Sequence, residues 1–112
     1  SGIGEQPALI HMTKFRLNGY TSGCVCVNPA LSQQMLSAVV AKDYDKAETI
    51  RRIFLPLEDL RNEINPIRVL HEAVSLAGIA VTGRHLPLLS GVTESAADRI
   101  RTAAKELLNR SL

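Results

Sequence analysis

Apolar residues recur at helical spacing through most of the chain. One such stripe covers residues 5–16, where Pro7 is tolerated because it falls in the first turn. The same spacing predicts further helices over residues 30–42 and from residues 43, 66 and 94 onward. Pro56 lies inside the apolar pattern that begins at residue 43, so it either kinks that helix or divides it in two.

Polar and small residues mark where these helices begin and end. Asn28-Pro29 and Asn65-Pro66 each combine a residue that caps a helix with a proline suited to the first turn. Thr93 is a third candidate cap, and Asn18-Gly19 indicates a helix stop. Between the last two helices, residues 79–92 are expected to form a loop.

One segment departs from the helical pattern. Residues 20–27 read Tyr-Thr-Ser-Gly-Cys-Val-Cys-Val, an uncharged run typical of a strand buried on both faces. Residues 1–3 are compatible with the tail of a second strand. Two such segments cannot form a sheet alone, so we expect the missing strands to come from another chain or from an absent part of this one.

Composition and charge limit the classes of function. The 112 residues are 46% hydrophobic, enough for one core, and carry a formal net charge of +2. So small a charge excludes nucleic acid or an acidic membrane surface as the main partner. The longest apolar stretch, residues 73–81, is too short to span a membrane, and the first residues contain no secretory signal.

The cysteine pattern bears on compartment and on metal binding. Cys24 and Cys26 are two positions apart, and on a strand they would share a face without being able to bridge. A single C-x-C with no second ligand pair does not predict a zinc site. Two unpaired thiols suit the reducing cytoplasm, so we expect a cytoplasmic protein with no metal or cofactor.

The order and spacing of several short motifs resemble a known family. The chain resembles the C-terminal portion of the dihydrodipicolinate synthase / N-acetylneuraminate lyase family, with the sugar-acid dehydratases as the nearest branch. The motifs that carry the resemblance are Ser1-Gly2-Ile3-Gly4-Glu5, Gly19-Tyr20-Thr21-Ser22-Gly23, Asn28-Pro29, Asp43-Tyr44-Asp45-Lys46-Ala47, Leu55-Pro56-Leu57, Asn65-Pro66-Ile67 and Leu86-Pro87-Leu88.

This resemblance implies an α/β fold. It makes residues 1–42 the last two β/α units of a (β/α)₈ (TIM) barrel and residues 43–112 a C-terminal region of three helices. Residues 20–27 would be the eighth strand of the barrel. A complete barrel needs roughly 250 residues, so the Ser1-Gly2 start would be the edge of a fragment.

The predicted substrate-binding set consists of Gly2, Glu5, Thr21 and Ser22. The resemblance implies Gly2, Thr21 and Ser22, and Glu5 joins them because residues 2–5 would form a loop at the C-terminal end of a barrel strand, where the site of such a barrel lies. Family members similar to this chain place a glycine at Gly2, near the distal part of the substrate. Thr21 and Ser22 match positions that line the keto-acid end of the pocket, where a hydroxyl can donate a hydrogen bond. Simpler explanations also exist, because an acid at a helix start such as Glu5 is favoured by the helix dipole, and small residues fit a tight interior.

The family forms a Schiff base between a lysine and a 2-keto acid, as a class I aldolase, lyase or dehydratase. The family's lysine and proton-relay tyrosine lie on strands that this chain lacks. Every lysine falls on a polar helix face or a helix end, where its amine should stay protonated: Lys14, Lys42, Lys46 and Lys105. No catalytic residue is therefore predicted, and the chain alone is expected to be inactive.

Two functions remain open at this point. In the first, the chain is part of an oligomeric enzyme acting on pyruvate or a keto-deoxy sugar acid, completed by the rest of a barrel or by other copies. In the second, it is a non-catalytic helical module for interaction or assembly, derived from such a barrel. The set Gly2, Thr21 and Ser22 favours the first, because an assembly module has no need to keep it.

Overall fold

The computed structural model describes residues 1–84 and 90–112, and these form helices joined by turns and loops. The helices are α1 (Glu5–Thr13), α2 (Pro29–Val40), α3 (Tyr44–Glu63), α4 (Pro66–Leu76) and α5 (Glu94–Leu108), with a short 3₁₀ helix, η1 (Cys24–Cys26), before α2. No strand occurs in these described residues. The predicted α/β class, with two β/α units of a barrel, is therefore wrong.

The predicted helix starts are confirmed at the level of hydrogen bonds. The Asn28 side chain accepts the N–H of Leu31, and the Asn65 side chain accepts the N–H groups of Ile67 and Arg68. Thr93 caps α5 in the same way by accepting from Ala96. Pro56 does not divide α3, which runs as one helix of 20 residues with the proline inside it.

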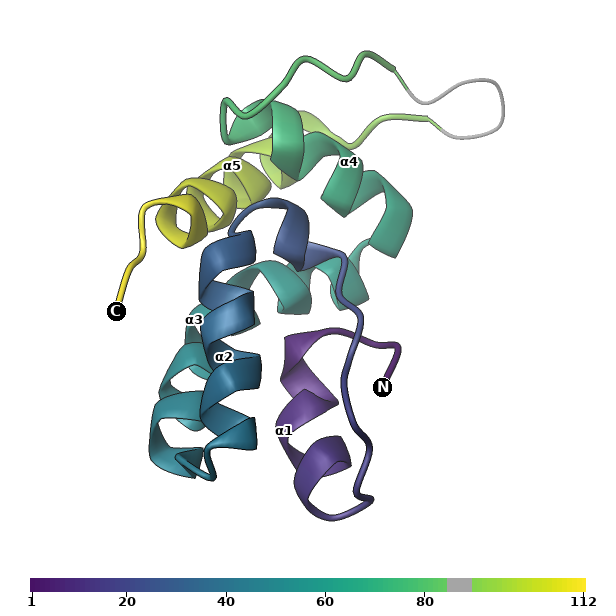
Figure 1. The fold of residues 1–112 in the computed structure, drawn as a ribbon. Coiled ribbons are helices and arrows are strands. Elements are labelled where there is room, and N and C mark those ends of the chain that lie inside the picture. The colour runs from purple at the N-terminus through teal and green to yellow at the C-terminus, as the bar shows by residue number, and fades with distance from the viewer. Residues whose placement is uncertain (85–89) are drawn as a thin grey trace.

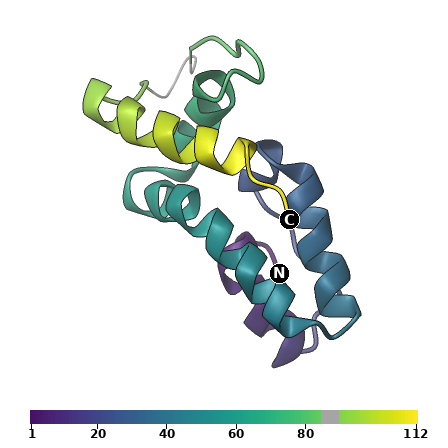
Figure 2. The same cartoon turned by 90° about the vertical axis from the view of Figure 1, so that its left-hand side faces the viewer.

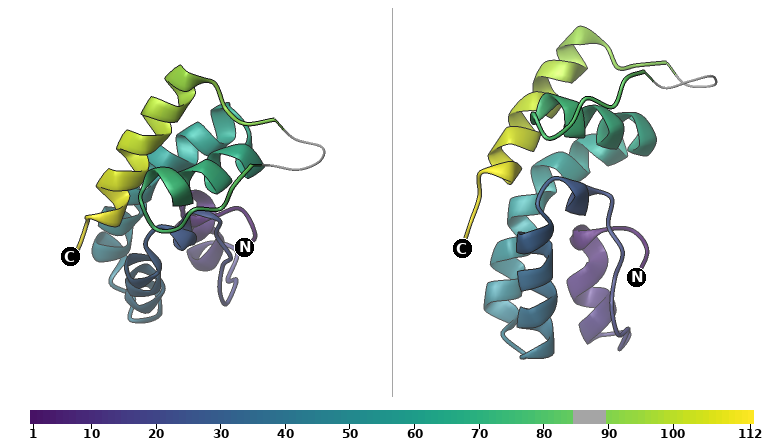
Figure 3. Two further views of the ribbon diagram at one scale, coloured as in Figure 1. Left: turned by 90° about the horizontal axis from the view of Figure 1, so that it is seen from above. Right: turned by 45° about the horizontal axis from the view of Figure 1, so that its top comes forward.

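Helix α3 organises the molecule because it contacts each of the other four α-helices. In Figure 1, α1 and α2 lie side by side against the first part of α3, while α4 and α5 cover its second part. Figure 2 shows α5 crossing close to α3, and the right-hand view of Figure 3 places α4 and α5 together above the other helices. The core runs along α3 through Ala47, Ile50, Phe54 and Leu57, none of which is more than 1% exposed.

Residues 20–27 form a loop and a 3₁₀ turn instead of the predicted strand. Two local contacts favour the turn: the Ser22 hydroxyl accepts the N–H of Val25, and the N–H of Val27 donates to the carbonyl of Cys24. Cys24 and Val27 are buried, at 0% and 1% exposure, so the apolar character of the segment serves the helical core. Because the described residues offer no neighbouring strand to pair with, the backbone N–H groups of this segment are satisfied locally in a turn.

The two segments predicted as strands nevertheless lie next to each other. The N–H of Thr21 donates to the carbonyl of Ser1 at 2.7 Å, and the N–H of Gly4 donates to the carbonyl of Thr21 at 3.0 Å. These two bonds do not extend into a ladder. They are sufficient to fix residues 1–4 against residues 20–21, which matters for the site below.

Some predictions stay untested by the fold. The motif Leu86-Pro87-Leu88 and the middle of the predicted loop 79–92 fall on residues 85–89, outside the described residues. The division into residues 1–42 and 43–112 also stays a prediction. Among the described helices, none combines the length and the apolar character that crossing a membrane would require.

Candidate functional site

A buried carboxyl group on α3 caps the first turn of α1. The Oε1 atom of Glu58 accepts the N–H of Glu5 at 2.9 Å, and its Oε2 atom accepts the N–H of Gln6 at 2.6 Å. A helix start has N–H groups without partners inside the helix, and Gly4 at the N-cap has no side chain to satisfy them. Glu58 therefore supplies from another helix the cap that the local sequence lacks.

Gly4 makes this arrangement possible in two ways. Its φ is +106°, in a region that is almost restricted to glycine. A Cβ atom built on Gly4 would also lie 2.0 Å from Oε1 of Glu58. Any side chain here would displace the carboxyl that caps α1.

The side chain of Glu5 points into the protein from the first residue of α1. Its Oε2 atom accepts the hydroxyl of Ser22 at 2.5 Å, and its Oε1 atom accepts the hydroxyl of Ser32 on α2 at 2.8 Å. The Tyr20 hydroxyl in turn donates to the carbonyl of Ser32 at 2.7 Å. We call the five residues Tyr20, Ser22, Ser32, Glu5 and Glu58 the carboxyl cluster.

Both carboxyl groups of this cluster are removed from water: Glu5 is 0% and Glu58 is 1% exposed. Burial, together with the neighbouring charge of Glu5 and a hydrogen bond to it, raises the pKa of Glu58 to about 7. The two N–H groups of α1 act in the opposite direction and limit the rise. Burial also raises the pKa of Tyr20 to about 12, so its hydroxyl keeps its proton.

The structure brings together all the residues expected to bind substrate. Gly2 lies beside Thr21, whose hydroxyl would be 3.9 Å from a Cβ on the glycine. Glu5 and Ser22 are joined directly by the hydrogen bond described above. The four residues come from the chain start and from residues 21–22, and the backbone bonds between these segments hold them in one place.

A pocket of about 360 Å³ opens beside this group. Its lining combines hydroxyl groups and one amide with apolar side chains: Tyr20, Thr21, Ser22, Val25, Pro29, Ser32, Gln33 and Leu36. The hydroxyl protons of Ser22, Ser32 and Tyr20 are already donated within the protein. Within residues 1–84 and 90–112, the hydroxyl of Thr21 has no hydrogen-bond partner and its residue is exposed, so this lining hydroxyl can donate to a ligand.

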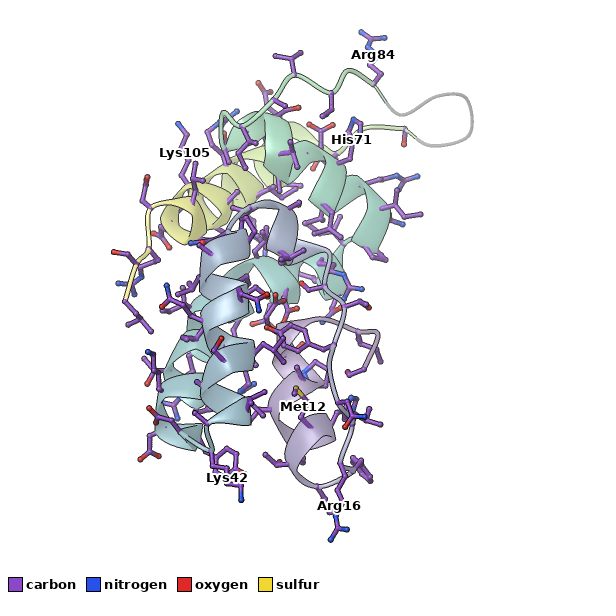
Figure 4. All side chains as sticks on the ribbon, in the orientation of Figure 1. Met12, Arg16, Lys42, His71, Arg84 and Lys105 are labelled. Atoms are coloured by element: carbon purple, nitrogen blue, oxygen red, sulfur yellow. The ribbon has the colours of Figure 1, made fainter. Side chains whose placement is uncertain are left out.

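The described residues contain no group that would form a Schiff base in this pocket. All lysines of the sequence are exposed on other parts of the surface, and in Figure 4 Lys42 and Lys105 point away from the body of the molecule. Over residues 1–84 and 90–112, no three metal-ligating side chains gather closely enough to hold an ion.

Sequence reasoning missed Glu58, Ser32 and Tyr20 as parts of the site. Glu58 could have been recognised from the sequence, because it follows Phe54 by four positions and so falls on the buried face of α3. A carboxylate on an apolar stripe needs a partner in the core. Ser32 and Tyr20 had no comparable signal, because their roles depend on where α2 packs against the loop.

No family model matches this chain, and no match was found among the curated proteins or the solved structures.

Proposed function

We propose that this chain is the substrate-binding, non-catalytic portion of a Schiff-base-forming lyase, aldolase or dehydratase that acts on a 2-keto acid. The observation that carries the proposal is that Thr21 and Ser22 line one hydroxyl-rich pocket, with Gly2 beside Thr21 and the buried Glu5 bonded to Ser22. A volume of about 360 Å³ suits a small organic acid. The Thr21 hydroxyl would donate to the acid, while Glu5 and Ser22 fix the loop that presents it.

The amine of the Schiff base would come from a partner polypeptide. A nucleophilic lysine must be desolvated enough to lose its proton at neutral pH. The exposed lysines of this chain do not meet that condition. The proposal therefore assigns this chain binding and positioning, and leaves the covalent step to the partner.

Binding and covalent chemistry are tested on the same preparation. Amide NMR spectra recorded while pyruvate is added should show shifts at residues 20–25 and 32–36, and Thr21→Val should weaken binding about tenfold, the value of one hydrogen bond. Thr49→Val, on α3 and outside the pocket, should leave binding unchanged. Borohydride with pyruvate should leave the mass of this chain unchanged. A covalent adduct on any of its lysines, or no shift around Thr21, would contradict the proposal.

A second candidate is a helical module for interaction or assembly. The observation that favours it is that Ser22 and Glu5 have a structural use in capping and closing the helical core, which an assembly module would also need. This candidate predicts concentration-dependent self-association in sedimentation experiments without any response of Thr21 to keto acids.

A further inference from the structure

Glu5 and Glu58 form a buried pair of carboxyl groups that the proposed binding role does not use. They lie 53 residues apart in the chain, and Oε1 of Glu58 accepts the backbone N–H of Glu5 at 2.9 Å, which brings the carboxyl of Glu58 to the first residue of α1. Neither is exposed by more than 1%. Two negative charges this close and this far from water repel strongly, so the pair is favoured when it holds one proton.

Neighbouring cations do not neutralise the pair. Two arginines of α3 that bond to the first residues of the chain or of α1 have other partners: Arg51 pairs with Glu48 and donates to the carbonyl of Gln6, and Arg61 donates to the carbonyl of Ile3. Within residues 1–84 and 90–112, no salt bridge reaches either carboxyl.

The other ionisable groups that interact with the pair stay neutral through the physiological range. Tyr20 faces the pair from the loop, and Cys24 and Cys26 face it from η1. Burial raises the pKa of all three. From α2 the pair is contacted by Ser32, which is uncharged. A change of charge in the cluster near neutral pH therefore belongs to the carboxyl pair itself.

We propose that the Glu5–Glu58 pair is a proton-operated latch. With one proton, it holds the first turn of α1 and residues 20–27 against α3. Without that proton, Glu5 is repelled from Glu58 and releases Ser22, and the loop that lines the pocket opens. The latch does not depend on which ligand the pocket takes.

The geometry indicates that Glu5, and not Glu58, moves when the pair loses its proton. Glu58 sits within a long helix and accepts two N–H groups of α1, contacts that become stronger when it is charged. Glu5 is held by two hydroxyls, and one of them, Ser22, belongs to a non-helical segment beside an open pocket. Movement of Glu5 and Ser22 toward the pocket restores water to one carboxylate while α3 stays intact.

The direction with pH follows from the raised pKa of Glu58. The closed form keeps the proton on Glu58 up to about pH 7. Opening moves the charge of Glu5 away and admits water to the cluster, so the pKa of Glu58 falls toward its ordinary value of 4.5. Between these values opening releases a proton, so the opening constant rises by up to about tenfold per pH unit. Stability of the closed form is complete below pH 4.5 and is lost as pH rises to 7.

Amide hydrogen exchange by NMR tests the latch. The reporters are the N–H of Val25, which donates to Ser22, and the N–H of Val27, which donates to Cys24. After correction for intrinsic exchange, their opening constants should rise at least about tenfold from pH 5.5 to 7. Glu58→Gln is neutral at every pH and should abolish the rise, whatever its effect on basal protection. Glu106→Gln, at an exposed position on α5, is the matched control and should keep the rise.

An opening constant that does not change with pH in the natural sequence would overturn the latch, and so would a rise that persists in Glu58→Gln. A second measurement needs no variant. Carbon-13 NMR of the glutamate carboxyls in the natural sequence should show one buried group that titrates near pH 7. Titration of every glutamate at or below its ordinary pKa would also overturn it.

Discussion

Substitution of Gly4 by alanine tests the packing between α1 and α3 most directly. The backbone of Gly4 has φ +106° and ψ −168°, a conformation that costs a residue with a Cβ about 1–3 kcal/mol. The new methyl group would lie 2.0 Å from Oε1 of Glu58, so the carboxyl must move. A displaced Glu58 gives up its bonds to the N–H groups of Glu5 and Gln6, at about 1–3 kcal/mol for each buried group left unpaired.

These contributions sum to about 3–9 kcal/mol. Because the group that must move is the far end of a flexible side chain, the expected loss in the free energy of unfolding lies toward the lower end, at about 4 kcal/mol. That is a large part of the stability of an ordinary domain, about 5–15 kcal/mol. Urea unfolding followed by circular dichroism measures it, and with an m-value of about 2 kcal/mol/M the midpoint should fall by about 2 M.

Gly78→Ala is the matched control. Gly78 also has a positive φ, +84°, but a Cβ there meets nothing within 4 Å. Only backbone strain remains, about 1–2 kcal/mol. If Gly4→Ala and Gly78→Ala have the same midpoint, contact with Glu58 is not what excludes a side chain at Gly4.

Three further predictions follow from other contacts. Asn28→Ala should lower the free energy of unfolding by about 2–4 kcal/mol in urea titrations, because Asn28 both caps α2 and donates to the carbonyls of Leu107 and Arg110. The control Asn65→Ala removes an ordinary cap and should cost about 1 kcal/mol. Equal losses would refute the role of Asn28 in holding the C-terminal end of α5. The free energy of unfolding should fall by about 2–3 kcal/mol between pH 4.5 and 7, because the pKa of Glu58 is about 7 in the folded protein and 4.5 when the residue is solvated. Stability that rises over this window would contradict the sign. Iodoacetamide at pH 8 should alkylate exposed Cys26 and spare Cys24, which is 0% exposed and whose pKa is raised by burial; peptide mass spectrometry that finds Cys24 modified first would show that η1 is not packed as described.

The local helix signals were reliable because their physics is local. The caps Asn28, Asn65 and Thr93 each satisfy N–H groups two or three residues away, and these bonds need nothing from the rest of the chain. The strand prediction for residues 20–27 was wrong because strand formation is not a local property. Apolar and β-branched residues suit any half-buried surface, and whether a strand forms depends on a partner strand that the described residues do not provide.

The candidate site also has one part that the sequence shows and another that only the folded structure shows. The sequence analysis singled out Gly2, Glu5, Thr21 and Ser22, and their positions near the chain start and in one later segment are visible in the sequence. Their meeting depends on backbone bonds between residues 1–4 and Thr21, and on a carboxyl from α3. Glu58 could have been noticed as a charge on an apolar stripe, although its partner could not have been named.

The sequence by itself determined where the helices begin, which of their faces are apolar and that its lysines lie on polar surfaces, because periodicity and capping act over one or two turns. Only the tertiary structure decided that residues 20–27 close into a turn and that Glu5 and Glu58 meet in the core. The physical reason is that a buried charge interacts with whatever folding brings near it. The ionisation of Glu58 therefore depends on a residue 53 positions away, which no local pattern identifies.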